Sequence, residues 1–223
     1  MMKNYKLLTW FAVYFVTILL ISNIVSTKIV NWWWFVRDGG TLLFPLSYII
    51  GDILTEVYGY AASRRVIWMW LWAQILMWLV VIWIWAMPAD ASRTFQEAYM
   101  QVLWFTPRII LASVIAYAVW EFTNSYILAK LKIMMQWSKL WVRTISSTLV
   151  GQWLDTIIFI VIAFWWVFDT STIIALIVSN YILKVSIEII FTPLTYRAVR
   201  KVKQIEHEDY YDTDTDFNPL KLG

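Results

Sequence analysis

Two acidic side chains lie inside an apolar segment, residues 45–60, which reads PLSYIIGDILTEVYGY. Asp52 and Glu56 are four residues apart, so a helix places them on one face. A charge at the centre of a bilayer costs about 2.5–3.5 kcal/mol on insertion scales, so each one needs a partner, a cavity or a function. Pro45 and Gly51 interrupt the regular helix, as is common in the substrate-binding helices of transporters. The segment therefore predicts a binding or gating element.

Two other apolar segments each carry a carboxylate beside an amide. Residues 120–130 read WEFTNSYILAK and place Glu121 three positions before Asn124. Residues 151–156 read GQWLDT and place Gln152 three positions before Asp155. Side chains three apart share a helix face, so each segment presents an acceptor-rich polar patch toward its neighbours.

A last polar stripe lies in residues 179–188, SNYILKVSIE, where Asn180, Lys184 and Glu188 recur at spacing four. In one interpretation Lys184 binds solute; in the other, Lys184 and Glu188 neutralise each other. Asn23 and Gln74 are single amides in apolar surroundings, and we expect them to join helices rather than bind a ligand.

These residue types suit one kind of ligand. Carboxylates accept paired N–H donors, such as the N1–H and 2-amino edge of a guanine-like ring, and amides satisfy a ring carbonyl and imino nitrogen together. Four aromatic residues are candidates to stack on a flat ring: Phe44, Tyr48, Phe122 and Tyr181. The pattern predicts a polar solute, planar or cationic, bound between helices near the membrane midplane.

Composition identifies the elements that hold these residues. Of 223 residues, 61% are hydrophobic and 15% charged, and the mean hydropathy is +0.63. Soluble domains are about 45–50% apolar and about 25% charged, so this chain is predicted to be a polytopic membrane protein. A disordered chain is excluded, and a net charge of only +3 argues against nucleic-acid binding. There is no cysteine, and the single histidine, His207, lies in a polar segment, so no metal site and no cofactor are expected.

The fold class predicted is all-α, with six transmembrane helices and both termini in the cytoplasm. Each span needs about 20 apolar residues. The expected spans are Leu7–Thr27, Thr41–Val57, Val66–Met87, Arg108–Ala129, Ile145–Phe168 and Ile173–Tyr196. With the termini inside, thirteen lysines and arginines fall in inner segments and four fall outside, which are Lys28, Arg37, Arg93 and Arg108. This asymmetry follows the positive-inside rule.

Two domains are expected: a transmembrane transporter domain over residues 1–204 and an acidic cytoplasmic tail over 205–223. The tail, IEHEDYYDTDTDF in its first part, is interpreted as solvated, with a docking peptide as the alternative. Residues 88–107 are expected to form an outer loop with an amphipathic turn.

Tryptophan is unusually frequent in this chain, with 17 tryptophans against only 6 glycines. Tryptophan belongs at the membrane interface, and glycine is frequent in membrane helices. Yet Trp70, Trp72 and Trp78 run into a helix interior, and Trp32–Trp34 are consecutive in a predicted turn. We hypothesise that many of these positions are glycine in the living protein, because its source reads the UGA codon as glycine. The alternative is a genuinely tryptophan-rich protein.

The segments FPLSYIIGDILTEVYGYAASRRVIW, EFTNSYILAKLK, GQWLDTIIFI and SNYILKVSIEIIFTPLTY resemble the queuosine precursor transporter family, also called the vitamin uptake transporter family. The resemblance covers about residues 10–210. It implies a six-helix inner-membrane importer of the 7-deazaguanine bases preQ0 and preQ1, which serve the queuosine modification of tRNA. At Trp153 the family pattern has glycine, and the position before Glu121 and the pair Trp165–Trp166 depart in a similar way.

The resemblance implies a pocket built from eight residues: Asp52, Glu56, Glu121, Asn124, Gln152, Asp155, Asn180 and Lys184. Asp155 or Glu121 would accept the ring N–H and amino protons, and Gln152 or Asn124 would read the ring carbonyl. Glu56 with Arg64 and Arg65 is the predicted cytoplasmic gate; alternatively these three form a plain ion-pair anchor at the interface.

Three other classes of membrane protein compete with a carrier. The chain has no GxxxxGK[ST] motif and binds no nucleotide by that route. It could instead be the substrate-binding subunit of an energy-coupling uptake system, with ATPase partners, although residues 10–22 lack the small-residue face typical of such subunits. An intramembrane protease would need Asp52 and Asp155 as a pair, and a scaffold would leave the buried carboxylates unexplained. We expect no enzyme; the expected partners are the deazapurine substrate and the lipid bilayer, and a homo-oligomer stays open.

Overall fold

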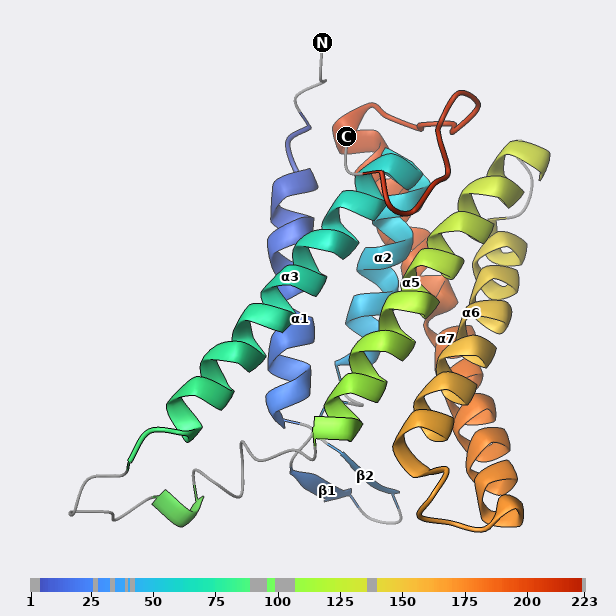
Figure 1. The fold of residues 1–223 in the computed structure, drawn as a ribbon. Coiled ribbons are helices and arrows are strands. Elements are labelled where there is room, and N and C mark those ends of the chain that lie inside the picture. The colour runs from blue at the N-terminus through green and yellow to red at the C-terminus, as the bar shows by residue number, and fades with distance from the viewer. Residues whose placement is uncertain are drawn as a thin grey trace.

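The structure, a computed structural model, describes residues 5–25, 28–32, 35–38, 40, 43–88, 96–98, 107–135 and 140–221. Six long helices form a bundle (Figure 1): α1 Leu8–Val25, α2 Phe44–Tyr58, α3 Tyr60–Trp85, α5 Pro107–Met135, α6 Leu140–Phe164 and α7 Thr170–Glu206. The predicted helical class is confirmed. The predicted turn at 33–34 and most of the predicted loop 88–107 lie outside the described residues.

Four of these helices, α1, α3, α6 and α7, are long and apolar enough to cross a membrane. Helix α2 has 15 residues, so it spans about 22 Å at 1.5 Å per residue. Helix α5 is long enough, with 29 residues, but carries Glu121 and Asn124 in its middle. The six long helices correspond to the six predicted segments. The number of helices that cross the membrane stays a prediction.

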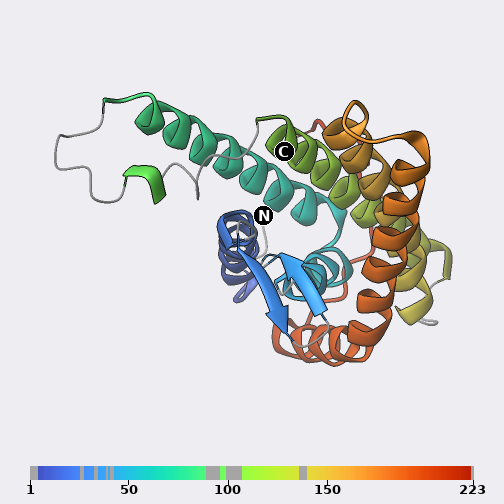
Figure 2. The ribbon, with the colours of Figure 1, turned by 90° about the horizontal axis from the view of Figure 1, so that it is seen from below.

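A short antiparallel hairpin, which the sequence did not predict, closes one end of the bundle between α1 and α2 (Figure 2). Strand β1, Ile29–Trp32, pairs with β2, Phe35–Asp38, in the register Ile29↔Asp38 to Trp32↔Phe35. Helix α3 leans away from the other helices, so that its C-terminal half projects from the bundle (Figures 1 and 2).

Helix α2 lies at the centre, in contact with α1, α3, α5 and α7. It is buried on nearly every side; of its described side chains only Leu46 and Ile50 escape full burial. Pro45 in its first turn suits a helix start, because the missing N–H there would have no intrahelical partner. Placement at the centre explains how a short helix rich in polar residues is kept from lipid.

Hydroxyl and amide groups join the helices. Thr55 of α2, Ser63 of α3 and Ser125 of α5 form a buried triangle of hydrogen bonds at 2.9–3.1 Å. Asn23 Nδ2 of α1 donates to Gln74 Oε1 of α3 at 2.9 Å. The prediction that Asn23 and Gln74 join helices is therefore confirmed.

The C-terminal segment packs onto the bundle, which corrects the interpretation of residues 205–223 as a solvated tail. Helix α7 runs on to Glu206, whose carboxylate accepts hydrogen bonds from the backbone N–H groups of Lys6 and Leu7 at the start of α1. The Asp212 carboxylate, 1% exposed, accepts from the Tyr60 N–H at the start of α3. Acidic groups suit both sites, because helix N-termini expose unpaired N–H donors.

Candidate functional site

The predicted polar residues of α2 and α5 meet inside the bundle. Asp52 and Glu121 are both almost fully buried. Asn124 Nδ2 donates to Asp52 Oδ1 at 3.5 Å. Glu121 Oε1 reaches Gly51 so closely that a Cβ there would lie 2.8 Å away, so Gly51 is what admits this carboxylate between the helices.

A third carboxylate joins from α7. Glu188 is 2% exposed and lies near enough to Asp52 and Glu121 for the three to interact electrostatically. Within the described part of the chain, no ion pair involves any of the three. These carboxylates would repel one another strongly in a low-dielectric interior if all were ionised, so a ligand bearing several N–H donors would stabilise the cluster.

Helix α6 adds the next two predicted residues. Gln152 is buried and lies close to the Tyr48 hydroxyl of α2. Asp155 forms an ion pair with Lys184 of α7. The interpretation in which Lys184 neutralises Glu188 is therefore wrong: the two share a helix, but Lys184 reaches across to α6.

Asn180 stays apart from the cluster. Its Nδ2 donates to Leu176 O one turn earlier in α7, at 2.9 Å, and the side chain is only partly buried. Two aromatic candidates also point elsewhere: Phe122 packs on Trp68 of α3, and the Tyr181 hydroxyl donates to Leu149 O of α6. The side chain of Phe44 lies outside the described part of the structure, and of the other three predicted stacking residues Tyr48 lies in the cluster.

Glu56 belongs to a separate charge network at the end of the bundle where α1 begins and α7 ends. Its fully buried carboxylate pairs with Arg143 Nη2 of α6 at 2.6 Å and Lys203 Nζ of α7 at 2.8 Å, and Lys132 Nζ of α5 lies 3.8 Å away. Asp209, in the C-terminal segment, binds both lysines. Hydrogen bonds from Lys132 and Lys203 hold the pKa of Asp209 below its usual value, despite partial burial.

The gate predicted from Glu56 with Arg64 and Arg65 is not formed. Arg64 Nη1 donates to the carbonyls of Asp216 and Asn218 in the C-terminal segment, at 2.7 Å each. Arg65 Nε donates to Ala61 O in its own helix. Arg143, Lys132 and Lys203 were missed because each stands at a helix end that sequence reading assigns to a charged loop.

Many polar atoms of the cluster have no hydrogen-bond partner in the described protein. They are Asp52 Oδ2, both oxygens of Glu121, Asn124 Oδ1, Gln152 Oε1, Thr156 Oγ1 and Glu188 Oε2. The Tyr117 hydroxyl lies near Glu121 without reaching hydrogen-bonding geometry. Buried polar groups are nearly always satisfied, so this concentration of acceptors indicates a site for a hydrogen-bond donor. Among the described residues, no acidic or histidine side chains are grouped to hold a metal ion.

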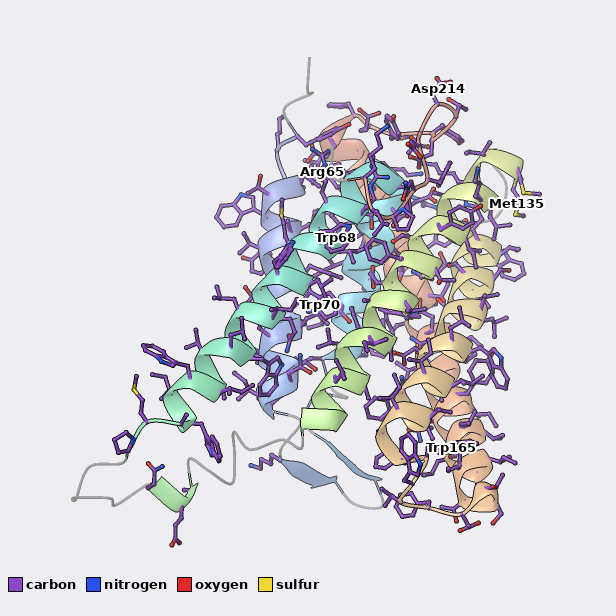
Figure 3. All side chains as sticks on the ribbon, in the orientation of Figure 1. Arg65, Trp68, Trp70, Met135, Trp165 and Asp214 are labelled. Carbon is purple, nitrogen blue, oxygen red and sulfur yellow. The ribbon has the colours of Figure 1, made fainter. Side chains whose placement is uncertain are left out.

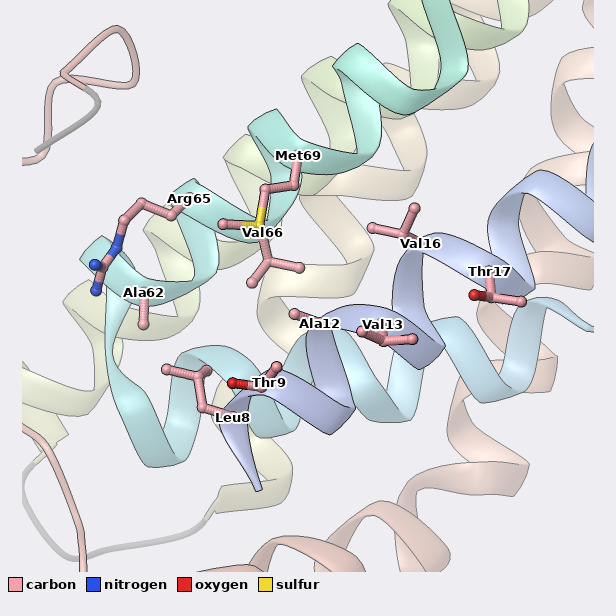
Figure 4. A pocket seen from close by; sticks show the side chains of 10 residues that line it. All are labelled: Leu8, Thr9, Ala12, Val13, Val16, Thr17, Ala62, Arg65, Val66 and Met69. Carbon is pink, nitrogen blue, oxygen red and sulfur yellow. The ribbon is translucent and has the colours of Figure 1, made fainter. Parts of the chain in front are cut away.

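A pocket of about 410 Å³ lies elsewhere, between α1 and α3 (Figure 4). Leu8, Ala12, Val16 and Val66 are typical of its lining, with Arg65 at one end. None of the predicted binding residues lines it, and its apolar walls suit a lipid chain better than a polar solute.

Four of the described tryptophans lie in two contrasting environments. Trp165 and Trp166 are exposed just after α6, at the end of the bundle, where interfacial tryptophan is ordinary (Figure 3). Trp70 and Trp120 are 2% exposed in the interior, and their indole N–H groups have no hydrogen-bond partner among the described residues. A buried tryptophan usually finds one, so these two positions fit the proposed glycine better than tryptophan.

Comparison with known proteins adds independent findings. Residues 38–198 match the family model described as "Putative vitamin uptake transporter". The chain is 24% identical over 186 residues to the "Probable queuosine precursor transporter" of Bacillus subtilis (strain 168), covering 83% of this chain and 81% of that protein. It is 26% identical over 163 residues to the "Queuosine precursor transporter" of Escherichia coli (strain K12), covering 73% and 71%. No solved structure matches the chain significantly.

Proposed function

The chain belongs to the vitamin uptake transporter family, and from this premise we propose that it imports the queuosine precursors preQ0 and preQ1 across the inner (cytoplasmic) membrane. These bases would then serve the queuosine modification of tRNA. The observation that carries the proposal is the buried, acceptor-rich cluster of Asp52, Glu121, Gln152 and Glu188, drawn from four helices. A carrier of an apolar solute would not need such a cluster of buried hydrogen-bond acceptors.

The residue roles follow from which atoms are already bonded. Glu121 has two unpartnered carboxylate oxygens and is the group to accept the ring N1–H and 2-amino protons. The amide oxygens of Gln152 and Asn124 have no hydrogen-bond partner among the described residues, and Asn124 already uses its amide nitrogen on Asp52. Lys184, held by Asp155, is the cation to donate to the ring carbonyl. Asn180 has no part in this assignment.

The charge balance of the cluster favours one precursor. Asp52, Glu121 and Glu188 interact with one another electrostatically, and none of the described ion pairs includes any of these three carboxyl groups. The aminomethyl group of preQ1 is a cation at neutral pH, whereas the cyano group of preQ0 is neutral. Desolvated carboxylates gain most from an opposite charge, so we expect preQ1 to compete better than preQ0 for uptake.

Orientation follows from the helix count. If α2 and α5 cross together with the four apolar helices, six spans place both termini on one side, and the excess of lysine and arginine makes that side the cytoplasm. The network of Glu56 with Arg143, Lys203 and Asp209 then closes the cytoplasmic end of the bundle. Opening toward the cytoplasm requires these ion pairs to separate.

The test is complementation of a bacterium that neither makes nor imports queuosine precursors. Cells would carry the chain as written, or a version with the suspect tryptophans, Trp153 among them, changed to glycine. Cells receive nanomolar preQ0 or preQ1, and queuosine in tRNA is measured. Queuosine with either version supports the proposal; no queuosine, although both reach the membrane, contradicts the substrate.

Two variants locate the site within the same assay. Asp155→Ala removes the partner of Lys184 and should abolish uptake while the protein stays in the membrane. Asp214→Ala, which removes an exposed carboxylate of the C-terminal segment, should leave uptake unchanged. Co-purification of an ATPase pair would instead favour the substrate-binding subunit of an energy-coupling system.

A further inference from the structure

The indole of Trp120 fills a slot between three helices. It is 2% exposed on α5, with its ring 5.0 Å from Tyr48 of α2 and 4.8 Å from Tyr117, both edge to face. On the third side α6 presents Gly151, where a Cβ would lie 2.7 Å from Trp120 Cδ1. The slot is thus a narrow space between two aromatic rings, and a glycine lets α6 approach it.

The indole packs in this slot through contacts of its ring with neighbouring aromatic rings. Its N–H has no hydrogen-bond partner in the part of the chain that the structure describes, although it lies deep in a polar part of the bundle. The Trp70 ring lies 4.6 Å from Tyr117, so the slot continues a row of aromatic rings into α3. A buried tryptophan usually has a hydrogen-bond partner for its N–H group. The slot therefore accommodates a flat ring but does not satisfy the indole donor.

The acceptors of the proposed site border the slot. Tyr48, which contacts the Trp120 ring, also lies close to Gln152. Tyr48 and Gly51 are three apart on α2, so the face that meets Trp120 also meets the Glu121 carboxylate one turn along. Gln152 Oε1 and both Glu121 oxygens have no hydrogen-bond partner. A ring with N–H groups along one edge, placed in the slot, would bring donors to these acceptors.

We propose that the slot now filled by the Trp120 indole is the seat of the transported ring, and that it is open in the living protein because position 120 is glycine there. Indole and 7-deazaguanine are both fused five- and six-membered rings, so one slot fits either. This inference rests on the proposed function and adds where the substrate stacks. As written, the chain carries a mimic of its substrate.

The first experiment uses purified full-length protein in detergent and asks for chemical rescue. Trp120→Gly should lower the unfolding temperature by opening a cavity, and added indole should restore it in a concentration-dependent way. 7-Deazaguanine should do the same and compete with indole. Trp72→Gly, a loss of the same side chain at a position that is 61% exposed on α3, should respond to neither. If Trp120→Gly does not fold, Trp120→Ala takes its place.

The outcomes separate the slot from the transport function. If indole rescues and 7-deazaguanine does not, or if Trp120→Gly responds no more than Trp72→Gly, the slot assignment is overturned. In the complementation assay we expect at least a tenfold gain in uptake for Trp120→Gly over the chain as written. Equal uptake by Trp120→Gly and the chain as written would support the transport function and contradict the slot assignment. Binding of 7-deazaguanine without queuosine in tRNA would keep the slot and remove the proposed substrate pathway.

Discussion

The Glu56 network offers a sharp test of how the bundle is closed, through the substitution Glu56→Gln. Glu56 is 0% exposed and meets Arg143 at 2.6 Å and Lys203 at 2.8 Å. Removing one partner of a buried ion pair costs about 3–5 kcal/mol. Lys132 and Lys203 keep Asp209 as a partner, which limits the loss. We therefore expect the lower end, about 3 kcal/mol, or roughly a 150-fold fall in the folded-to-unfolded ratio.

Thermal unfolding of the purified protein measures this loss, because about 2–4 °C of melting temperature correspond to 1 kcal/mol at this chain length. Arg143→Gln should cost less than Glu56→Gln, since Glu56 then keeps Lys203. The double variant should cost less than the sum of the two single ones, as for any directly coupled pair. Lys201→Gln, which removes an exposed positive charge from the same end of α7, should stay within about 0.5 kcal/mol. If Glu56→Gln melts where Lys201→Gln does, the network does not hold the bundle closed.

Three further predictions concern the C-terminal segment and the tryptophans. The pKa of Asp209 is lowered in the folded state, so its ion pairs stabilise the fold above the unfolded pKa of about 3.9, and this stabilisation is lost as pH falls through the folded pKa. Melting temperatures measured from pH 7 to pH 3 should therefore fall, and Asp209→Asn should make this fall smaller. Gly59→Ala should cost more than about 2 kcal/mol, since φ is +84° and a Cβ would lie 2.3 Å from Tyr210 Cδ1. In a Tyr210→Ala background the cost should fall to the backbone strain and the remaining contact with Asp212 Oδ1 at 3.0 Å, and an unchanged cost there would refute the steric share of Tyr210. Mass spectrometry of protein isolated from its native cells should find glycine at position 153, and peptides with Trp153 would refute the codon hypothesis.

Sequence alone determined the environment of this protein and the chemistry it carries. An apolar fraction of 61% cannot be buried in a single core, so a membrane class followed from composition. Helix periodicity placed Glu121 beside Asn124 and Gln152 beside Asp155, because residues three apart share a face whatever surrounds them. The cost of polar groups in lipid predicted a functional position for Asp52, and the structure buries this residue in the cluster.

Only the tertiary structure decided which of these groups meet. Lys184 and Glu188 share a stripe of α7, yet Lys184 pairs with Asp155 of α6. Glu56 was assigned to nearby Arg64 and pairs instead with Arg143, 87 residues away. Spacing along one helix fixes a face but not the rotation of that face toward a neighbour, and that rotation depends on the packing of all six helices together. For the same reason the C-terminal segment, hydrophilic by composition, is held against the bundle, because its carboxylates meet the unpaired N–H groups at the starts of α1 and α3.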